Sequence, residues 1–209
     1  MTEYPLIRKR IDIGWNYSSV QFAKIVMIPD LQPNKPFPPE NLLQLDESKG
    51  KFGFMNTKCE EYNEYEKEVL NLIDPVIEDN TIIIMSEFGF TKQLEEKVSQ
   101  KLINKKGKCI IVGGSYYFKN KNNKIESRCP IILPNRQIEY QLKFLPSPKE
   151  KDKGFDPPDL KEIIIFQNSG FGDFAILVCF DALNDDLINR IKNHLRSSID
   201  YLIIIYNCV

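Results

Sequence analysis

Six short runs of apolar and mostly β-branched residues constrain the fold of this chain more than any other feature. These runs are AKIVMI (23–28), TIIIM (81–85), CIIVGG (109–114), EIIIF (162–166), FAILVCF (174–180) and YLIIIY (201–206). They are apolar almost throughout and do not alternate with polar residues, which is typical of strands that are buried on both faces. The chain is therefore expected to form a sheet core that is covered on both sides.

Amphipathic segments lie between several of these runs. Apolar residues recur at three- and four-residue spacing in NEYEKEVLNLID (63–74), TKQLEEKVSQKLINKKG (91–107) and LNDDLINRIKNHL (183–195), which predicts helices. Thr91 and Asn184 are candidate N-caps, and Gly107 is a candidate C-terminal stop. Strands that alternate with helices predict a layered α/β fold.

The middle of the chain departs from this alternation. Residues 115–146 contain hairpin-like strands around the polar tip KNKNNK, so the sheet is expected to be mixed. The proline-rich stretches PDLQPNKPFPPE (29–40) and PSPKEKDKGFDPPD (146–159) predict loops, because proline interrupts regular elements. Long loops in a compact domain are often functional.

The composition argues against several classes of protein. The 209 residues are 42% hydrophobic, which fits a globular domain, and 28 Lys plus Arg against 29 Asp plus Glu give a net charge of −1. Without a basic excess nucleic-acid binding is not expected, and the runs NKKGK and KNKNNK are interpreted as solvated. No apolar run approaches the roughly 18 to 20 residues of a membrane helix and no signal peptide is evident, which predicts a cytoplasmic protein with no membrane partner. Five widely spaced cysteines without a CxxC pair suggest neither a disulfide framework nor a zinc site.

Three residues with chemically useful side chains lie at or near the ends of predicted strands. Glu87 follows TIIIMS, Lys143 lies in YQLKFLP, and Cys179 follows FAILV. Taken singly, each has a plainer interpretation: a strand-ending charge in solvent, a lysine on a solvated strand face, and a small core residue. Cys179 also precedes a predicted helix, whose N-terminus is expected to lower the pKa of the thiol. Open α/β sheets place sites at the carboxyl ends of strands, so the three side chains are expected to converge.

In this order the three residues resemble the Glu–Lys–Cys triad of the carbon–nitrogen hydrolase superfamily, which includes nitrilases and aliphatic amidases. IIIMSEFGF is similar to the family's strand-then-glutamate motif, and IIVGGSYYF to the glycine-rich strand after it. YQLKFLPSPKE is similar to the lysine motif, in which Glu150 is the second glutamate. GDFAILVCFDA is similar to the nucleophile elbow, with Phe180 and Asp181 after the cysteine. The likeness spans roughly residues 22 to 208.

The resemblance implies an α-β-β-α sandwich with mixed, mostly buried sheets and outer helices. It implies a thiol hydrolase that cleaves a non-peptide carbon–nitrogen bond (amide, carbamoyl or nitrile) through a thioester on Cys179. Glu87 would be the general base, and Lys143 would stabilise the oxyanion with the backbone N–H of Phe180. Glu150 would orient the charges of the site. The resemblance further implies a small amide or nitrile substrate, a homodimer through outer helices, and neither a cofactor nor a metal ion.

The likeness also divides the chain. Residues 1–21 precede the first core strand and are expected to be an N-terminal extension of unknown role, and residues 22–209 the nitrilase-like domain. Members of the family continue beyond the strand that DYLIIIYNC resembles, so the domain is expected to lack the usual C-terminal part. The alternative to an enzyme is an interaction or regulatory domain of a larger protein, with weak or no hydrolysis. His194, the only histidine, lies in the helix predicted after the elbow, so a Cys–His mechanism has little support.

Overall fold

The computed structural model describes residues 6–14, 24–28, 43–46, 51–54, 60–87, 90, 92–105, 108–122, 124–152, 155–170, 172–195 and 198–206. The proline-rich loop 29–40, the candidate cap Thr91 and the candidate stop Gly107 lie outside these residues.

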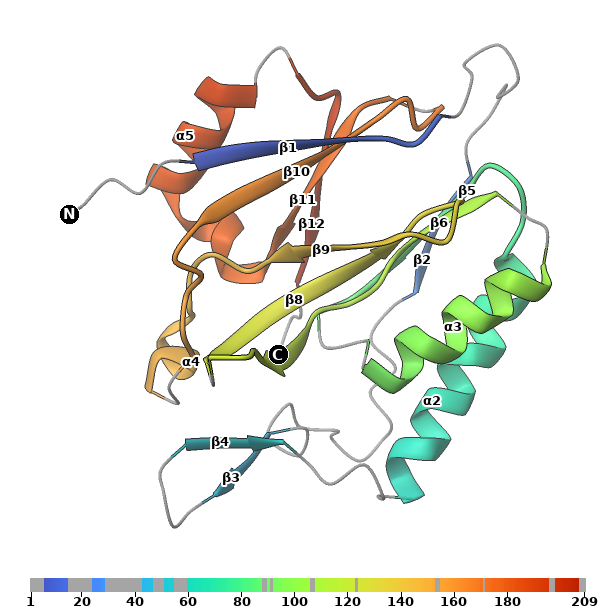
Figure 1. Ribbon diagram of the computed structural model, residues 1–209, viewed down its shortest axis with the longest axis horizontal. Coiled ribbons are helices and arrows are strands. Elements are labelled where there is room, and N and C mark those ends of the chain that lie inside the picture. Colours follow the sequence, from blue (N-terminus) through green and yellow to red (C-terminus); the bar gives the residue numbers. More distant parts are fainter. Residues whose placement is uncertain are drawn as a thin grey trace.

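Two β-sheets form the centre of the molecule (Figure 1). The four-stranded sheet has the order β1–β10–β11–β12. Its strands are β1 (Leu6–Asp12), β10 (Lys161–Gln167), β11 (Phe174–Val178) and β12 (Tyr201–Ile205). β10 and β11 are antiparallel, whereas β1 runs parallel to β10 and β12 runs parallel to β11.

The six-stranded sheet has the order β2–β5–β6–β8–β7, and β9 also pairs with β8. Its strands are β2 (Lys24–Ile28), β5 (Thr81–Met85), β6 (Cys109–Val112), β7 (Tyr116–Lys119), β8 (Ile125–Ile132) and β9 (Ile138–Leu142). β2, β5 and β6 are parallel, and the partners of β8 are all antiparallel to it. The predicted mixed sheet and the hairpins of residues 115–146 are therefore confirmed. A separate antiparallel hairpin joins β3 (Leu43–Asp46) and β4 (Lys51–Phe54).

Helices cover the outer faces of both sheets. α2 (Glu60–Ile73) and α3 (Lys92–Asn104) pack on the six-stranded sheet, and α5 (Asp185–Leu195) packs on the four-stranded sheet (Figure 1). The predicted cap Asn184 is confirmed, because the Leu187 N–H donates to its Oδ1 at 2.8 Å. The short elements are α4 (Pro148–Asp152) and the 3₁₀ turns η1 (Asp74–Val76) and η2 (Cys179–Leu183).

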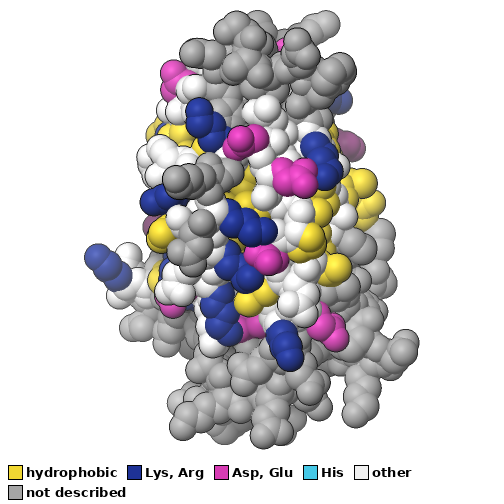
Figure 2. Space-filling model, turned by 90° about the vertical axis from the view of Figure 1, so that its right-hand side faces the viewer, with side chains coloured by type: hydrophobic (Ala, Val, Ile, Leu, Met, Phe, Trp, Pro, Cys, Tyr) yellow, Lys and Arg dark blue, Asp and Glu magenta, His cyan; other side chains and the backbone are white. Residues whose placement is uncertain are grey.

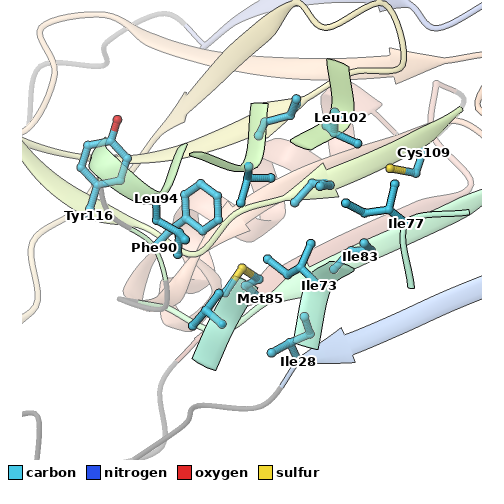
Figure 3. Close-up of a cluster of buried hydrophobic side chains, with 14 residues drawn as sticks. Ile28, Ile73, Ile77, Ile83, Met85, Phe90, Leu94, Leu102, Cys109 and Tyr116 are labelled. Carbon is cyan, nitrogen blue, oxygen red and sulfur yellow. The ribbon is translucent and has the colours of Figure 1, made fainter. Parts of the chain in front are cut away.

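The apolar runs of the inner strands do not alternate with polar residues, because the two faces of these strands pack into two different cores. In β5, Ile83 and Met85 pack under α2 and α3 in the cluster of Figure 3, whereas Ile82 lies in the core between the sheets. In that second core the rings of Phe166 and Phe174 stack with their centroids 4.9 Å apart. A third core lies under α5. The predicted α-β-β-α sandwich is thus the observed architecture.

Two of the six apolar runs are only partly buried. β2 and β12 each lie at the end of the strand order in their sheet. Met27 in β2 is 75% exposed, and Ile204 in β12 is 42% exposed. The expectation of burial on both faces is therefore wrong for these two strands, because each pairs with a neighbour on one side only in the described sheet.

The Lys-rich runs lie on a surface that carries both signs of charge. Lys105, from NKKGK, lies 3.2 Å from an Asp74 carboxylate oxygen, and Lys124, from KNKNNK, lies 2.9 Å from one of Asp159. Figure 2 shows Lys and Arg side chains beside Asp and Glu side chains, with apolar side chains between them. Within the described ranges, no helix is both long enough and apolar enough to span a membrane.

The described part of the predicted N-terminal extension belongs to the sandwich. Residues 6–12 form β1, which pairs along its whole length with β10. The Lys9 ammonium also donates to Glu139 in β9 at 2.6 Å, which ties the two sheets together. β1 is therefore an edge strand of the four-stranded sheet.

The prediction of a loop over the whole of residues 146–159 is wrong for α4. Ser147 is the N-cap of this short helix: the Glu150 N–H donates to Ser147 Oγ at 3.3 Å, and the Ser147 N–H donates to Glu150 Oε2 at 2.6 Å. This reciprocal pair is a capping box, and Pro148 takes the first helical position, where its missing N–H costs nothing. The signal Ser-Pro-x-Glu was present in the sequence.

Candidate active site

The ends of three strands bring the candidate residues together. Glu87 lies two residues after β5, Lys143 directly after β9, and Cys179 directly after β11. The backbone N–H of Lys143 donates to the carbonyl of Ser127 in β8 at 2.9 Å, so the lysine continues the pairing of the sheet. Cys179 has φ of +48°, a left-handed conformation that is uncommon for a residue with a side chain. The chain therefore turns sharply at the cysteine as β11 enters η2.

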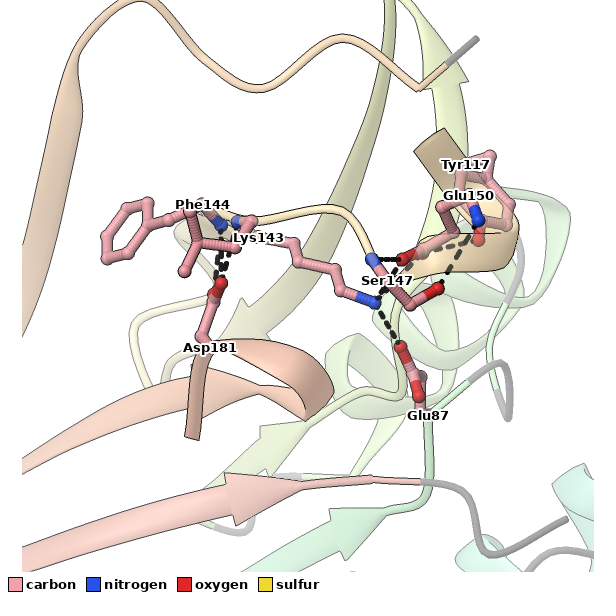
Figure 4. Close-up of polar contacts among 8 residues, drawn as sticks. Glu87, Tyr117, Lys143, Phe144, Ser147, Glu150 and Asp181 are labelled. Atoms are coloured by element: carbon pink, nitrogen blue, oxygen red, sulfur yellow. Dashed lines mark hydrogen bonds and ion pairs between the residues drawn. The ribbon is translucent and has the colours of Figure 1, made fainter. Parts of the chain in front are cut away.

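Lys143 lies between two carboxylates (Figure 4). Its ammonium is 3.0 Å from Glu87 Oε1 and 2.8 Å from each carboxylate oxygen of Glu150. The Lys143 side chain is 1% exposed and that of Glu87 2% exposed. The plainer interpretations of these two residues as solvent-facing charges are therefore wrong, since a buried charge needs a partner and each has one here.

Cys179 completes the cluster. Its thiol lies beside the Glu87 carboxylate, close enough for each group to shift the pKa of the other, and the side chain is only partly exposed. Burial raises the pKa of the Cys179 thiol to about 12, and the Glu87 carboxylate adds to the rise while Lys143 opposes it. The expectation that a helix N-terminus lowers this pKa is wrong. α5 begins only at Asp185, and desolvation outweighs any helix dipole at that separation.

The two carboxylates beside Lys143 are perturbed in opposite directions. Burial raises the pKa of Glu87, although the Lys143 ammonium and the neighbouring Cys179 thiol act against the rise. Burial alone would also raise the pKa of Glu150, but Lys143 and the hydrogen bonds to Glu150 outweigh it and hold that pKa below its usual range. For Lys143, the two carboxylates outweigh burial and raise the pKa. The arrangement favours a permanent Lys143–Glu150 ion pair and a Glu87 that can exchange a proton.

Glu150 is fixed by two further contacts besides Lys143. The Tyr117 hydroxyl in β7 donates to Glu150 Oε1 at 2.6 Å, and the Ser147 N–H donates to Oε2 (Figure 4). The sequence interpretation did not include Tyr117. Its only signal was its place in SYYF on the glycine-rich strand next to the site.

Asp181 connects the elbow to the lysine segment. Its carboxylate accepts from the Phe144 N–H at 3.0 and 2.9 Å and from the Leu145 N–H at 2.7 Å. Burial raises the pKa of Asp181 to about 7, although these backbone hydrogen bonds oppose the rise. Asp181 therefore fixes the position of Cys179, two residues before it, relative to Lys143, directly before Phe144.

The remaining candidates occupy defined positions. Phe180 follows Cys179 in η2 and is partly exposed. The thiols of Cys109 and Cys129 are buried, and Cys59 and Cys208 lie outside the described residues. In the described part of the chain, no group of three or more His, Cys, Asp or Glu side chains could hold a metal ion.

Comparison with solved structures places this geometry in a known fold. The sequence matches no protein-family model and no curated protein. The structure is similar to a carbon–nitrogen hydrolase of Helicobacter pylori (TM-score 0.53, 15% identity, 71% of this chain and 56% of that one). It is also similar to a CN-hydrolase superfamily protein of Xanthomonas campestris with an arsenic adduct in its active site (TM-score 0.52, 14% identity, 70% of this chain and 59% of that one). A third neighbour is a cysteine-to-serine mutant of a Nesterenkonia amidase from the nitrilase superfamily (TM-score 0.50, 12% identity, 68% of this chain and 60% of that one).

These likenesses confirm the fold that the sequence motifs predicted. The chain has the fold of the carbon–nitrogen hydrolase superfamily, and the matches span less than two thirds of the length of these neighbours. At 12–15% identity they speak for the fold alone, so the chemistry has to be argued from the side chains of this chain.

Proposed function

We propose that this protein is a thiol hydrolase that cleaves the carbon–nitrogen bond of a small amide, carbamoyl compound or nitrile. The observation that carries the proposal is the buried ammonium of Lys143 between two carboxylates, one of which lies beside the Cys179 thiol. Buried ionisable groups with opposed pKa perturbations are typical of catalytic sites. The names of the neighbours as amidases and carbon–nitrogen hydrolases support the same class.

The first half of the proposed reaction uses Glu87 as the base. Because the thiol is neutral at rest, the proton has to leave as the sulfur attacks, and the Glu87 carboxylate beside the thiol is placed to accept it. The Cys179 Sγ–carbon bond forms, and the carbonyl oxygen of an amide becomes an oxyanion near Lys143 and the Phe180 N–H. Glu87 then returns the proton to the leaving nitrogen, the C–N bond breaks, and an amine or ammonia departs from the thioester.

The second half returns the enzyme to its starting state. Glu87 takes a proton from water, the resulting nucleophile attacks the thioester, and the carbon–sulfur bond breaks. The proton on Glu87 goes to the sulfur, which restores the thiol and releases a carboxylic acid. The Lys143 charge stays constant throughout, because Glu150 keeps it paired.

The test combines alkylation with turnover. The protein is treated with iodoacetamide, and the modified cysteine peptides are quantified by mass spectrometry over time. We expect Cys179 to react faster than the buried Cys109 and Cys129, and Lys143→Gln to slow that reaction, because a nearby cation favours the thiolate. Ammonia release from a panel of small amides and nitriles should fall by about 10²- to 10⁴-fold in Glu87→Gln.

The variant Cys179→Ala provides the control for turnover. It should release no ammonia above the uncatalysed rate, and undiminished release would disprove the proposal. If the wild-type protein hydrolyses nothing in the panel although Cys179 reacts as expected, the interaction or regulatory alternative is favoured instead.

A further inference from the structure

Two adjacent tyrosines of β7 point to opposite faces of the six-stranded sheet. Tyr116 packs in the core under α2 and α3, so Tyr117 faces the other sheet. Tyr117 pairs directly with Ser127, and Ser127 bonds through its backbone to Lys143. Tyr117, Ser127 and Lys143 therefore form a row across three neighbouring chain segments on one face, since cross-strand partners project to the same side.

The two ends of this row meet at Glu150. Glu150 Oε1 accepts from the Tyr117 hydroxyl at 2.6 Å and from the Lys143 ammonium at 2.8 Å. Ser127 between them is fully buried and small, which leaves room for the two longer side chains to converge. Figure 4 shows the phenol and the ammonium directed at the same carboxylate.

The phenol and the Lys143 ammonium donate to the same oxygen, Glu150 Oε1. The ammonium divides its hydrogen bonds between Glu150 and Glu87. Without the phenol, Lys143 would be the one described side chain that donates to Glu150 Oε1, and the ammonium would be drawn further toward Glu150. Less of the positive charge would then act on Glu87 and on the Cys179 thiol.

We infer that Tyr117 is a positioning residue of this site: its hydroxyl fixes the Glu150 carboxylate and so keeps the Lys143 charge available to Glu87 and Cys179. The inference rests on the proposed function. Burial and the neighbouring Glu150 carboxylate raise the pKa of Tyr117, so its hydroxyl stays a donor throughout the physiological range.

The test compares Tyr117→Phe with Tyr140→Phe. Tyr140 is a matched control because its hydroxyl donates to another buried carboxylate, Glu95, at 2.8 Å on the outer side of the same sheet. The carboxyl carbon of Glu150 is titrated by ¹³C NMR in both variants, and alkylation of Cys179 by iodoacetamide is timed at neutral pH. Tyr117→Phe should raise the pKa of Glu150 by about one pH unit or more and slow the alkylation by about threefold to tenfold. Tyr140→Phe should change neither.

The results separate this inference from the proposed function. Equal Glu150 titrations and equal alkylation rates in the two variants would overturn the role of Tyr117, whatever the protein hydrolyses. Conversely, a shifted Glu150 titration and slower alkylation would support that role even if Cys179→Ala proved the hydrolase proposal wrong. If Tyr117→Phe does not fold, a fluorinated tyrosine at position 117, which is a stronger donor of similar shape, should lower the Glu150 pKa. An unchanged pKa there would again overturn the inference.

Discussion

Two buried glutamates accept phenol hydrogen bonds on opposite faces of the same sheet. On the inner face Glu150 accepts from Tyr117, and on the outer face Glu95 accepts from Tyr116 at 2.7 Å and from Tyr140 at 2.8 Å. Both carboxylates are almost completely shielded from solvent. In both clusters tyrosine hydroxyls offset the cost of burying a carboxylate. The clusters differ in the positively charged side chains around that carboxylate.

The cation of the outer cluster remains in contact with water. Lys92 bonds to Glu95 at 2.5 Å, but its side chain is 50% exposed. A second cation, Arg128, lies with its guanidinium carbon 3.7 Å from the Phe118 ring centroid and 4.3 Å from that of Tyr140. Positive charge is therefore ample around Glu95, and the described contacts of this cluster include no thiol. These contacts are those of a structural ion pair packed on aromatic rings.

The inner cluster has too little positive charge for its carboxylates. One buried ammonium, that of Lys143, serves both Glu87 and Glu150. Burial raises the pKa of Glu87, and the Glu150 carboxylate adds to the rise while Lys143 opposes it. The comparison indicates that buried acids alone do not mark a site. What sets the inner cluster apart is one buried ammonium shared by two carboxylates, with a thiol beside them.

The largest expected effect comes from removing the inner cation. Lys143→Met would leave two carboxylates buried without a counter-ion, and such changes cost about 3–5 kcal/mol of unfolding free energy. Lys92→Met removes a half-exposed partner of Glu95 and should cost about 1 kcal/mol or less. Urea denaturation at pH 7 measures both values.

A double variant tests the cause of that loss. Lys143→Met with Glu150→Gln removes one surplus charge and should recover part of the stability lost in Lys143→Met. Equal losses in the Lys143 and Lys92 variants would mean that the inner and outer clusters do not differ in the way described.

The layered fold was predictable because its signals are local and repeated. Every apolar run became a strand, and the three helical spacings became α2, α3 and α5. Burial on both faces held for the inner runs and failed at the edge strands β2 and β12, because an apolar run does not encode its place in the strand order. The positions of the three candidate residues, Glu87, Lys143 and Cys179, at the ends of strands also predicted that their side chains lie close together, since strand ends of such sheets meet at one edge.

The rest of the site depended on contacts that sequence spacing does not encode. Tyr117 reaches Glu150 only because β7 and β8 pair in a particular register, and Asp181 bonds a segment 36 residues earlier at Leu145. The direction of the Cys179 pKa depended on how deeply the thiol is buried beside Glu87. α4 differs from these cases, because its capping-box pattern is present in the sequence. The prolines around it favoured the prediction of a loop instead.

A second prediction concerns Asp181, a buried acid whose described hydrogen bonds come from backbone donors and from no cation. Its folded-state pKa of about 7 lies above the ordinary value near 4. Between these two pH values the folded protein therefore keeps a proton on Asp181 that the unfolded chain has released. Stability contributed by this group is therefore present at low pH and is lost as pH rises from about 4 to about 7, by up to about 4 kcal/mol. Glu150, whose pKa is lowered by its cation, contributes in the opposite sense.

Asp181→Asn isolates this contribution, because asparagine does not titrate. Unfolding free energies of both proteins are measured in urea at pH 4.5 and pH 7.5. The wild-type protein should lose more stability between these two pH values than the variant does. The same dependence on pH in both proteins would assign the effect to other carboxylates.

The smallest expected effect distinguishes two helix caps. Ser147 caps α4 and Asn184 caps α5. Replacing either by alanine should cost about 1 kcal/mol of unfolding free energy, because each side-chain oxygen satisfies an N–H in the first turn of its helix. Only Ser147 borders the inner cluster, through its backbone N–H to Glu150.

The variant Ser147→Ala keeps that backbone N–H donor, so the position of the Glu150 carboxylate should become only slightly less well fixed. We expect Ser147→Ala to slow alkylation of Cys179 by about twofold, and Asn184→Ala to leave the rate unchanged at the same loss of stability. Rates are measured with iodoacetamide at neutral pH, well below the unfolding transition of each variant. A matching slowdown in Asn184→Ala would show that the thiol responds to general loosening of the fold. A slowdown confined to Ser147→Ala would show that Cys179 depends on how firmly α4 holds its glutamate.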